Sequence, residues 1–271
     1  MSSREYKIIV EERWKDLLER SQTQERDFQE FIERHPSIMP NNLFLGGHHH
    51  PFPLALVSQP RLTGISSRIP DFMLIVRDSA CVTVILYEIE DPGKTWYTNG
   101  DQPTADLTQA MNQLIEWKNW FQDPINVLGF KSTYRIPDWY LANRAFRQRY
   151  VLIYGRQNDP SLIRNNPKRA LLEQPDIHLM TYDRLGFNSY FNDLMTVRFD
   201  GEYIAKYVQP TLRWGPVQSM YYHIIKGKED AIKMNPDIPE ERKKFLISRS
   251  KYWDNYGSKG RPSIITHPST E

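Results

Sequence analysis

Three acidic residues, Asp71, Glu88 and Glu90, flank a segment whose pattern could bring them together. Residues 72–87 form two runs rich in Ile, Val, Leu and Phe with a polar break at Asp78-Ser79, which predicts two antiparallel strands joined by a short turn. In such a pair the start of one strand lies beside the end of the next, so Asp71 is expected near Glu88 and Glu90. The two glutamates are two residues apart, so their side chains point to the same face.

Carboxylates that converge at a sheet edge repel one another, and a bound divalent cation relieves the repulsion. Oxygen ligands of this kind suit Mg²⁺ or Mn²⁺, and such a site is used in metal-dependent phosphodiester cleavage. The other interpretation of the same pattern is a surface hairpin whose acidic ends are solvated. Zinc binding is not expected at His48–His50, because adjacent side chains in extended chain point in opposite directions and no Cys-rich partner exists.

The elements around this hairpin alternate between helix and strand, which predicts an α/β domain with a mixed central sheet flanked by helices. In chain order, the pattern predicts a short strand leading into a helix over 4–20, a helix over 22–35, a strand over 54–57, the hairpin, a helix over 105–121, a strand over 150–154, a helix over 160–173, a strand over 177–181 and a helix over 182–195. Gln113 lies at the border of the buried stripe of its helix, from where it could donate a hydrogen bond to a site on the sheet.

The composition narrows the class of protein. With 271 residues, 39% of them hydrophobic, the chain is long enough for one large domain or for one domain with an appendage. The single cysteine, Cys81, lies in a predicted strand, so no disulfide can form within the chain, which fits a reducing cytosol. The charged N-terminal segment does not read as a signal peptide, and no apolar run approaches the ~18–20 residues that span a bilayer. We therefore expect a soluble, cytoplasmic protein without membrane association.

Positive charge is concentrated between Trp139 and Arg169, where seven basic residues accompany one acid, Asp159, although the net charge of the chain is only +2. Such a local excess can bind phosphates, but it is also common on a solvated face. The basic residues are Arg144, Arg147, Arg149, Arg156, Arg164, Lys168 and Arg169. Arg68, just before Asp71, is a further candidate for contact with a substrate.

Several segments around these residues resemble one known domain. They are QERDFQEFIERHPSIMP, PDF at residues 70–72, YEIEDP at residues 87–92, QLIEW at residues 113–117, IYGR and TYDRL. Together they are similar to the Shedu-type nuclease domain of bacterial anti-phage nucleases in the PD-(D/E)xK superfamily. The resemblance runs from Gln22 to Leu194 and implies a restriction-endonuclease-like core over 22–195 with an insertion at 123–148. Residues 1–21 and 196–271 would then be N-terminal and C-terminal extensions.

The resemblance also implies roles for individual residues. Asp71 and Glu88 match the metal-binding acids of the family, and the carbonyl of Ile89 would be a further ligand. Glu25 matches the helix-borne acid that often completes the metal site. Gln113 matches the polar residue on the helix that follows the hairpin.

Glu90 stands where the superfamily usually has a lysine. That lysine helps to align or deprotonate the attacking water, a task that a carboxylate can also perform, and a carboxylate would add a ligand for a second metal. Lys94, in the loop after the motif, is the nearest substitute cation.

The resulting hypothesis is an Mg²⁺- or Mn²⁺-dependent nuclease in anti-phage defence, with DNA as the preferred substrate and endonuclease rather than exonuclease action. Residues expected to contact the phosphate backbone are Arg68, Arg144, Arg147, Arg149 and Arg156. Members of the family assemble as homo-oligomers, so the resemblance also implies a homo-oligomer. Two alternatives stay open: a catalytically inactive nucleic-acid-binding or assembly module, and a regulatory protein that recognises another protein.

Overall fold

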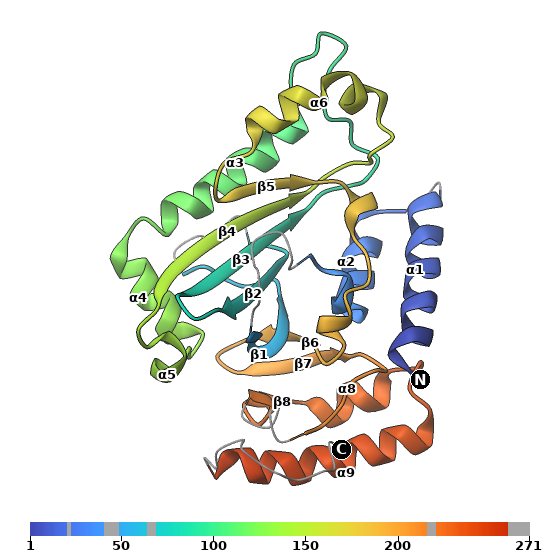
Figure 1. The fold of residues 1–271 in the computed structure, drawn as a ribbon, viewed down its shortest axis with the longest axis vertical. Coiled ribbons are helices and arrows are strands. Elements are labelled where there is room, and N and C mark those ends of the chain that lie inside the picture. The colour runs from blue at the N-terminus through green and yellow to red at the C-terminus, as the bar shows by residue number, and fades with distance from the viewer. Residues whose placement is uncertain (21–22, 41–48, 64–68, 216–220, 260–271) are drawn as a thin grey trace.

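The structure, a computed structural model, describes residues 1–20, 23–40, 49–63, 69–215 and 221–259. Its centre is a mixed sheet of eight strands with helices on both faces (Figure 1), so the predicted α/β class is confirmed. Within these ranges no helix combines the length and the apolar character needed to cross a bilayer.

The strands are, in chain order, β1 (His49–Ser58), β2 (Phe72–Arg77), β3 (Cys81–Ile89), β4 (Ala145–Ile153), β5 (Ile177–Met180), β6 (Met195–Phe199), β7 (Tyr203–Val208) and β8 (Ile225–Lys226). They lie in the order β5-β4-β3-β2-β1-β6-β7-β8. β3, β4 and β5 are parallel to one another, whereas β2 is antiparallel to both of its neighbours. The carboxyl ends of β3, β4 and β5 therefore lie together with the start of β2 along one edge of the sheet, where edge means the line formed by strand ends and not an outer strand.

The helices are α1 (Ser3–Glu19), α2 (Glu25–Arg34), α3 (Ala105–Trp120), α4 (Pro124–Thr133), α5 (Asp138–Leu141), α6 (Pro160–Leu172), α8 (Lys228–Met234) and α9 (Glu240–Ser258). Single 3₁₀ turns add η1 (Pro36–Ile38), η2 (Tyr182–Arg184) and η3 (Ser189–Phe191). α6 and α9 lie at opposite ends of the molecule (Figure 1).

The predicted hairpin is present as β2 and β3, with Phe72 paired to Tyr87. Its turn is fixed by Asp78, whose carboxylate accepts hydrogen bonds at 2.6 Å from the backbone N–H groups of Ala80 and Cys81. β3 is buried along its whole length. The acidic residues at its end therefore adjoin the protein core rather than open solvent.

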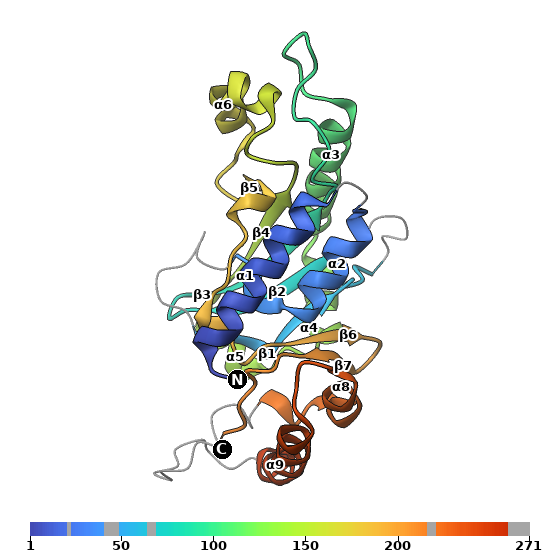
Figure 2. The same ribbon diagram turned by 90° about the vertical axis from the view of Figure 1, so that its right-hand side faces the viewer.

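Different helices cover the two faces of the sheet, and Figure 2 shows α1 and α2 side by side on one of them. Trp14 of α1 shares a buried cluster with Tyr87 of β3. On the other face, Leu114 of α3 shares a buried cluster with Leu86. Because side chains alternate along a strand, Glu88 lies on the same side as Leu86 and faces α3.

The strand predicted before the first helix is wrong, because Ser3–Glu19 is a single helix. Ser2 and Glu5 form a capping box at its start. Its buried positions recur at helical spacing, three or four residues apart: Tyr6, Val10, Trp14 and Leu17.

The helix predicted over 182–195 is also wrong, because that segment contains only the turns η2 and η3. Between them, the Asn188 side chain accepts a hydrogen bond from the Tyr190 N–H at 3.0 Å. Local bonds of this kind compete with the backbone bonding of a helix.

The sheet extends further along the chain than the sequence pattern indicates. β4 begins at Ala145, so the last residues of the segment predicted as an insertion at 123–148 belong to the sheet. The predicted domain boundary between residues 195 and 196 falls within β6, and β6, β7 and β8 continue the sheet beyond β1. Buried residues of α8 and α9 belong to the same hydrophobic cluster as Leu114 of α3, with Ile232 and Leu246 as examples.

Candidate active site

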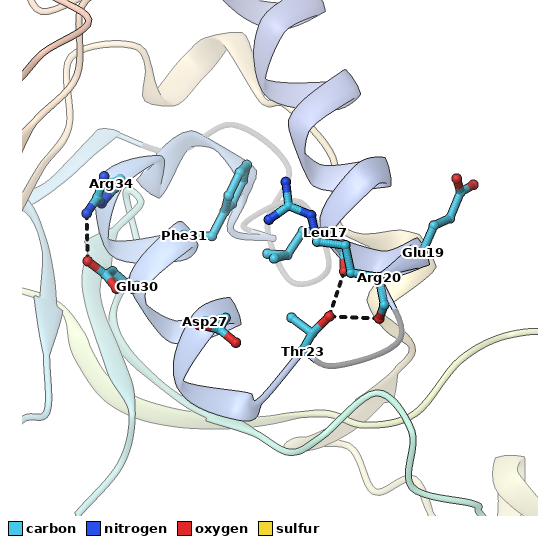
Figure 3. Close-up of a pocket in the computed structure, with 8 residues that line it drawn as sticks. All are labelled: Leu17, Glu19, Arg20, Thr23, Asp27, Glu30, Phe31 and Arg34. Atoms are coloured by element: carbon cyan, nitrogen blue, oxygen red, sulfur yellow. Dashed lines mark hydrogen bonds and ion pairs between the residues drawn. The ribbon is translucent and has the colours of Figure 1, made fainter.

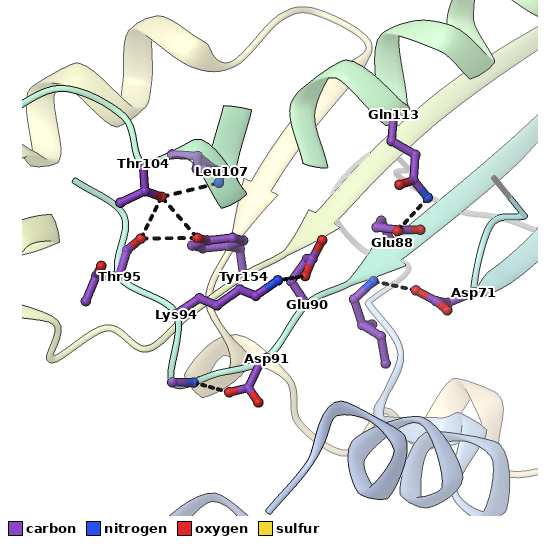
Figure 4. Close-up of polar contacts among 12 residues, drawn as sticks. Asp71, Glu88, Glu90, Asp91, Lys94, Thr95, Thr104, Leu107, Gln113 and Tyr154 are labelled. Carbon is purple, nitrogen blue, oxygen red and sulfur yellow. Dashed lines mark hydrogen bonds and ion pairs between the residues drawn. The ribbon is translucent and has the colours of Figure 1, made fainter. Parts of the chain in front are cut away.

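Asp71 and Glu88 lie side by side at the edge of the sheet where β2 begins and β3 ends (Figure 4). The pairing of Phe72 with Tyr87 makes Asp71 and Glu88 the next residues outward, on the face covered by α3. The Asp71 N–H donates to the Tyr87 carbonyl at 3.0 Å, and Asp71 Oδ2 accepts the Ile89 N–H at 2.9 Å. The backbone of the hairpin thus fixes the position of the aspartate.

Gln113 contacts Glu88 from α3. Its Nε2 donates a hydrogen bond to Glu88 Oε1 at 2.6 Å (Figure 4). Glu88 is only 8% exposed, and its other oxygen, Oε2, has no hydrogen-bond partner among the described residues. One oxygen of this buried carboxyl is therefore held in place while the second lacks a donor.

The carboxyls of Asp71 and Glu88 both have raised pKa values. Burial raises the pKa of Glu88, and the negative charge of Asp71 raises it further. Burial also raises the pKa of Asp71, against the opposing effect of the Ile89 hydrogen bond. Without a cation beside it, the pair therefore keeps a proton at a pH where isolated carboxyls are ionised.

Glu90 forms an ion pair with Lys94 next to this pair, with Lys94 Nζ donating to Glu90 Oε2 (Figure 4). The Lys94 and Glu90 side chains are 30% and 14% exposed, so the ion pair is largely shielded from water. Burial alone would lower the pKa of Lys94, but the hydrogen bond to Glu90 and its charge outweigh burial, and the pKa is raised. Lys94 is therefore a fixed cation beside the position where the superfamily usually has its lysine.

Glu25 reaches the same edge from the first turn of α2, on the other face of the sheet. Burial raises its pKa, and the charge of Glu90 raises it further. The charge of Glu25 in turn contributes to the raised pKa of Asp71. The structure thus brings four acids into one carboxylate cluster, defined as Glu25, Asp71, Glu88 and Glu90.

The donor chemistry of the cluster fits a hard divalent cation. The N–H and C=O of a strand residue point to the same side, so the Ile89 carbonyl faces the side on which its N–H meets Asp71. Across the described residues, no three His, Cys, Asp or Glu side chains are arranged as ligands of one ion. An ion at Asp71 and Glu88 would therefore depend on this carbonyl and on water or substrate oxygens.

Two of the arginines expected to bind phosphates lie far from the cluster. Arg147 pairs across the sheet with Thr83, five residues before Glu88, which is roughly 16 Å along the strand. Arg144 donates to the Asp78 carbonyl oxygen at 2.8 Å, in the hairpin turn. Both arginines thus lie toward the opposite end of β3 from the cluster.

The two other described arginines of that group lie nearer. Arg149 pairs across the sheet with Ile85 of β3. Arg156 follows β4 at the edge of the sheet that carries the cluster, but its side chain donates to Asp183 at 2.9 Å and to the Leu18 carbonyl at 2.8 Å. The contacts of Arg156 tie α1 and η2 to the end of β4.

Two sequence predictions fall outside what the structure describes. Arg68 belongs to an undescribed segment. The prediction that His48–His50 bind no metal concerns side chains that are not described either.

Tyr182 is a residue of the site that the sequence analysis did not single out. Its side chain is fully buried, and its hydroxyl has no hydrogen-bond partner within the described ranges. Burial raises its pKa well above the ordinary value, and the charges of Asp71 and Glu25 raise it further. Its ring packs against Phe28, which follows Glu25 by one turn of α2, with 5.1 Å between the ring centroids. Its position just after β5, a strand parallel to β4, was the available signal, because ligands gather at the carboxyl ends of parallel strands.

A separate cleft of about 650 Å³ lies between α1 and α2 (Figure 3). Its lining contains both acidic and basic side chains, and Glu30 and Arg34 form an ion pair at 2.6 Å. No member of the carboxylate cluster lines it. This cleft is therefore distinct from the candidate active site.

Comparison with known proteins identifies the family. A family model described as Shedu protein SduA, C-terminal, matches residues 22–185. No curated protein matches the chain. The matched residues make up more than half of the chain and include the whole carboxylate cluster together with Lys94, Gln113 and Tyr182. The resemblance seen in the sequence is thereby confirmed, and the chain belongs to the Shedu family, through the C-terminal domain of SduA.

Proposed function

We propose that the chain is a metal-dependent nuclease that hydrolyses phosphodiester bonds, with DNA as its substrate. The supporting observation is the buried pair of Asp71 and Glu88, in which Glu88 Oε2 lacks a hydrogen-bond partner among the described residues. Two such carboxyls are unfavourable side by side unless a proton or a cation joins them. Membership of the Shedu family suggests a role in anti-phage defence, and a homo-oligomeric assembly is part of the same proposal.

Asp71, Glu88 and the Ile89 carbonyl would hold Mg²⁺ or Mn²⁺, and Glu25 would complete the site from α2 through a metal-bound water rather than by direct contact. When bound, the ion would neutralise charge on the scissile phosphate and acidify the attacking water. Gln113 would keep the Glu88 carboxylate in its ligand orientation through the 2.6 Å hydrogen bond. These residues belong to four separate elements, the start of β2, β3, α2 and α3, so the fold fixes the site before substrate arrives.

Glu90 would orient the attacking water and accept its proton. Lys94 cannot take that role, because its raised pKa keeps it charged. It would instead hold the Glu90 carboxylate in place and stabilise negative charge that develops on the phosphate. The base and the cation of the site would then be two different side chains.

The test is cleavage of supercoiled circular DNA and of linear DNA by the full chain, with Mg²⁺, Mn²⁺ or a chelator. We expect metal-dependent cleavage of both forms, because an endonuclease needs no free end. Asp71→Asn and Glu88→Gln should abolish cleavage while the far-UV circular dichroism is unchanged. Glu202→Gln is the matched control, because Glu202 is exposed in the turn between β6 and β7.

The second candidate function is a catalytically inactive nucleic-acid-binding module of the same fold. It is favoured by the ion pair of Glu90 with Lys94, which already neutralises the residue in the lysine position. A wild-type chain that binds DNA but cleaves neither DNA form with either metal would establish this alternative. Metal-dependent cleavage that is lost in both cluster variants and kept in Glu202→Gln would exclude it.

A further inference from the structure

A cleft of about 470 Å³ opens beside the candidate active site, between α6 and η2. Its polar lining residues are Gln157, Asn166, Arg169, Thr181 and Arg184. None of the described residues that line it is acidic. The lining thus supplies two guanidinium groups, two amides and a hydroxyl, all of which can donate hydrogen bonds.

The hydroxyl of Thr181 is the most informative group in this lining. Thr181 is 1% exposed, and its Oγ1 has no hydrogen-bond partner in the described part of the chain. A buried hydroxyl left without a partner destabilises a protein by about 1–3 kcal/mol. Such groups in native proteins usually bind water or a ligand, so this hydroxyl indicates that the cleft is built to bind one.

Arg169 and Arg184 determine that a ligand of this cleft must be negatively charged. Arg169 lies with its guanidinium 5.8 Å from the centre of the Trp96 ring, and its Nη2 is 3.8 Å from Glu173 Oε1. That distance exceeds a hydrogen bond, so its donors are available to a ligand. Arg184 is exposed at the mouth of the cleft. Glu173 is not among the lining residues, so the cleft itself carries two guanidinium groups and no acid, which matches the charge of a phosphate group.

The sheet places this cleft close to the carboxylate cluster. Ile89 of β3 pairs with Ile153 of β4, and Ile153 pairs with Met180 of β5. Thr181 therefore lies two strands away from Glu90, about 10 Å at the usual strand spacing. One strand of nucleic acid rises about 3.4 Å per nucleotide, so a phosphate in the cleft would lie roughly three nucleotides from one at the cluster.

We infer that this cleft is a subsite for a backbone phosphate of the nucleic-acid strand that enters the candidate active site. The inference rests on the proposed function for its substrate, but it concerns binding rather than cleavage. It assigns the phosphate contact to Arg184, Arg169 and Thr181. Arg144 and Arg147, by contrast, lie toward the opposite end of β3.

The test measures binding of a fluorescently labelled 20-nucleotide strand and of its duplex to the full chain, in chelator, at several salt concentrations. Arg184→Ala should raise Kd roughly ten-fold for loss of one charge-assisted contact. It should also flatten the dependence of log K on log salt by about 0.7 for the single strand or 0.9 for the duplex. Thr181→Val, which keeps the shape of the side chain, should raise Kd without changing the salt dependence. Lys244→Ala is the matched control, because Lys244 is exposed on α9 at the far end of the molecule.

Each outcome decides for or against the subsite. If wild-type chain binds DNA and fails to cleave it, weaker binding by Arg184→Ala and Thr181→Val still supports the subsite while the nuclease proposal fails. If both variants bind DNA as tightly as Lys244→Ala, or if wild-type chain binds no nucleic acid, the subsite is refuted. Thermal stabilisation by inorganic phosphate that Arg184→Ala abolishes, with DNA binding unchanged, would identify a free-phosphate site and overturn the nucleic-acid assignment.

Discussion

The substitution Glu88→Gln separates the charge of the buried pair from its shape. Glutamine keeps the oxygen that accepts the hydrogen bond from Gln113 at 2.6 Å, but it does not titrate. Burial and the charge of Asp71 raise the pKa of Glu88 in the folded state, whereas an unfolded glutamate titrates near 4.3. Above about pH 4 the folded wild type therefore binds more protons than the unfolded chain, and its stability falls as the pH rises toward the folded pKa.

The size of this effect follows from proton linkage. A carboxyl that stays protonated only in the folded state lowers the free energy of unfolding by about 1.4 kcal/mol per pH unit. Between pH 5 and pH 7, wild type should lose up to ~2.7 kcal/mol relative to Glu88→Gln, or roughly 5–10 °C in Tm. Burial lowers the pKa of His35 to about 4, which acts in the opposite direction. The informative quantity is therefore the difference between the two proteins at each pH.

The assay is urea unfolding followed by far-UV circular dichroism, in chelator, at pH 5 and pH 7. A second series at pH 7 adds Mn²⁺, which should stabilise wild type by about 2.7 kcal/mol at a concentration one hundred times Kd. Glu88→Gln should gain much less, because it has lost one ligand charge. Equal stability differences at the two pH values, together with no stabilisation of wild type by Mn²⁺, would refute the reasoning.

Substitutions at three further positions test individual roles in the candidate active site. Glu90→Lys restores the usual residue of the superfamily and should keep part of the cleavage rate that Glu90→Ala loses; equal rates in the two variants would remove Glu90 from the mechanism. Glu25→Gln should raise the Mn²⁺ concentration needed for half-maximal cleavage with the fold preserved, and an unaltered metal titration would exclude Glu25 from the site. Tyr182→Phe should lower kcat and leave stability unchanged or about 1 kcal/mol higher, because it removes an unpaired buried hydroxyl; full activity would assign Tyr182 to packing alone.

The sequence predicted the hairpin and its acidic edge well because both are local. Alternation of apolar residues sets the register, and Asp78 marks the turn, so the approach of Asp71 to Glu88 follows from neighbouring residues. Helical spacing placed Gln113 at the border of the buried stripe of its helix, from where a contact with the sheet was possible. That it meets Glu88 depends on how α3 packs against β3.

The remaining features depend on pairings between distant segments. β6 pairs with β1, although more than a hundred residues separate them, so nothing near Met195 indicates that the sheet continues. Tyr182 lies at the same end of the sheet as the cluster because β5 is parallel to β4 and pairs with it. The basic residues between Trp139 and Arg169 lie at two different ends of the sheet, because β4 runs parallel to β3. This pairing places Arg147 beside Thr83 and leaves Arg156 at the edge that carries the cluster.

The loop after β3 explains how a glutamate can stand in the lysine position while a cation remains. Gly155, at the end of β4, lets this loop approach closely, because a Cβ at that position would lie 2.8 Å from the Lys94 carbonyl oxygen. The loop returns Lys94 to Glu90, so the cation comes from the loop and the acid from the strand. Among the described residues, Lys94 thus pairs with Glu90 and not with Asp71 or Glu88. The divalent cation that we propose would therefore still meet two acidic ligands in the buried pair of carboxyls.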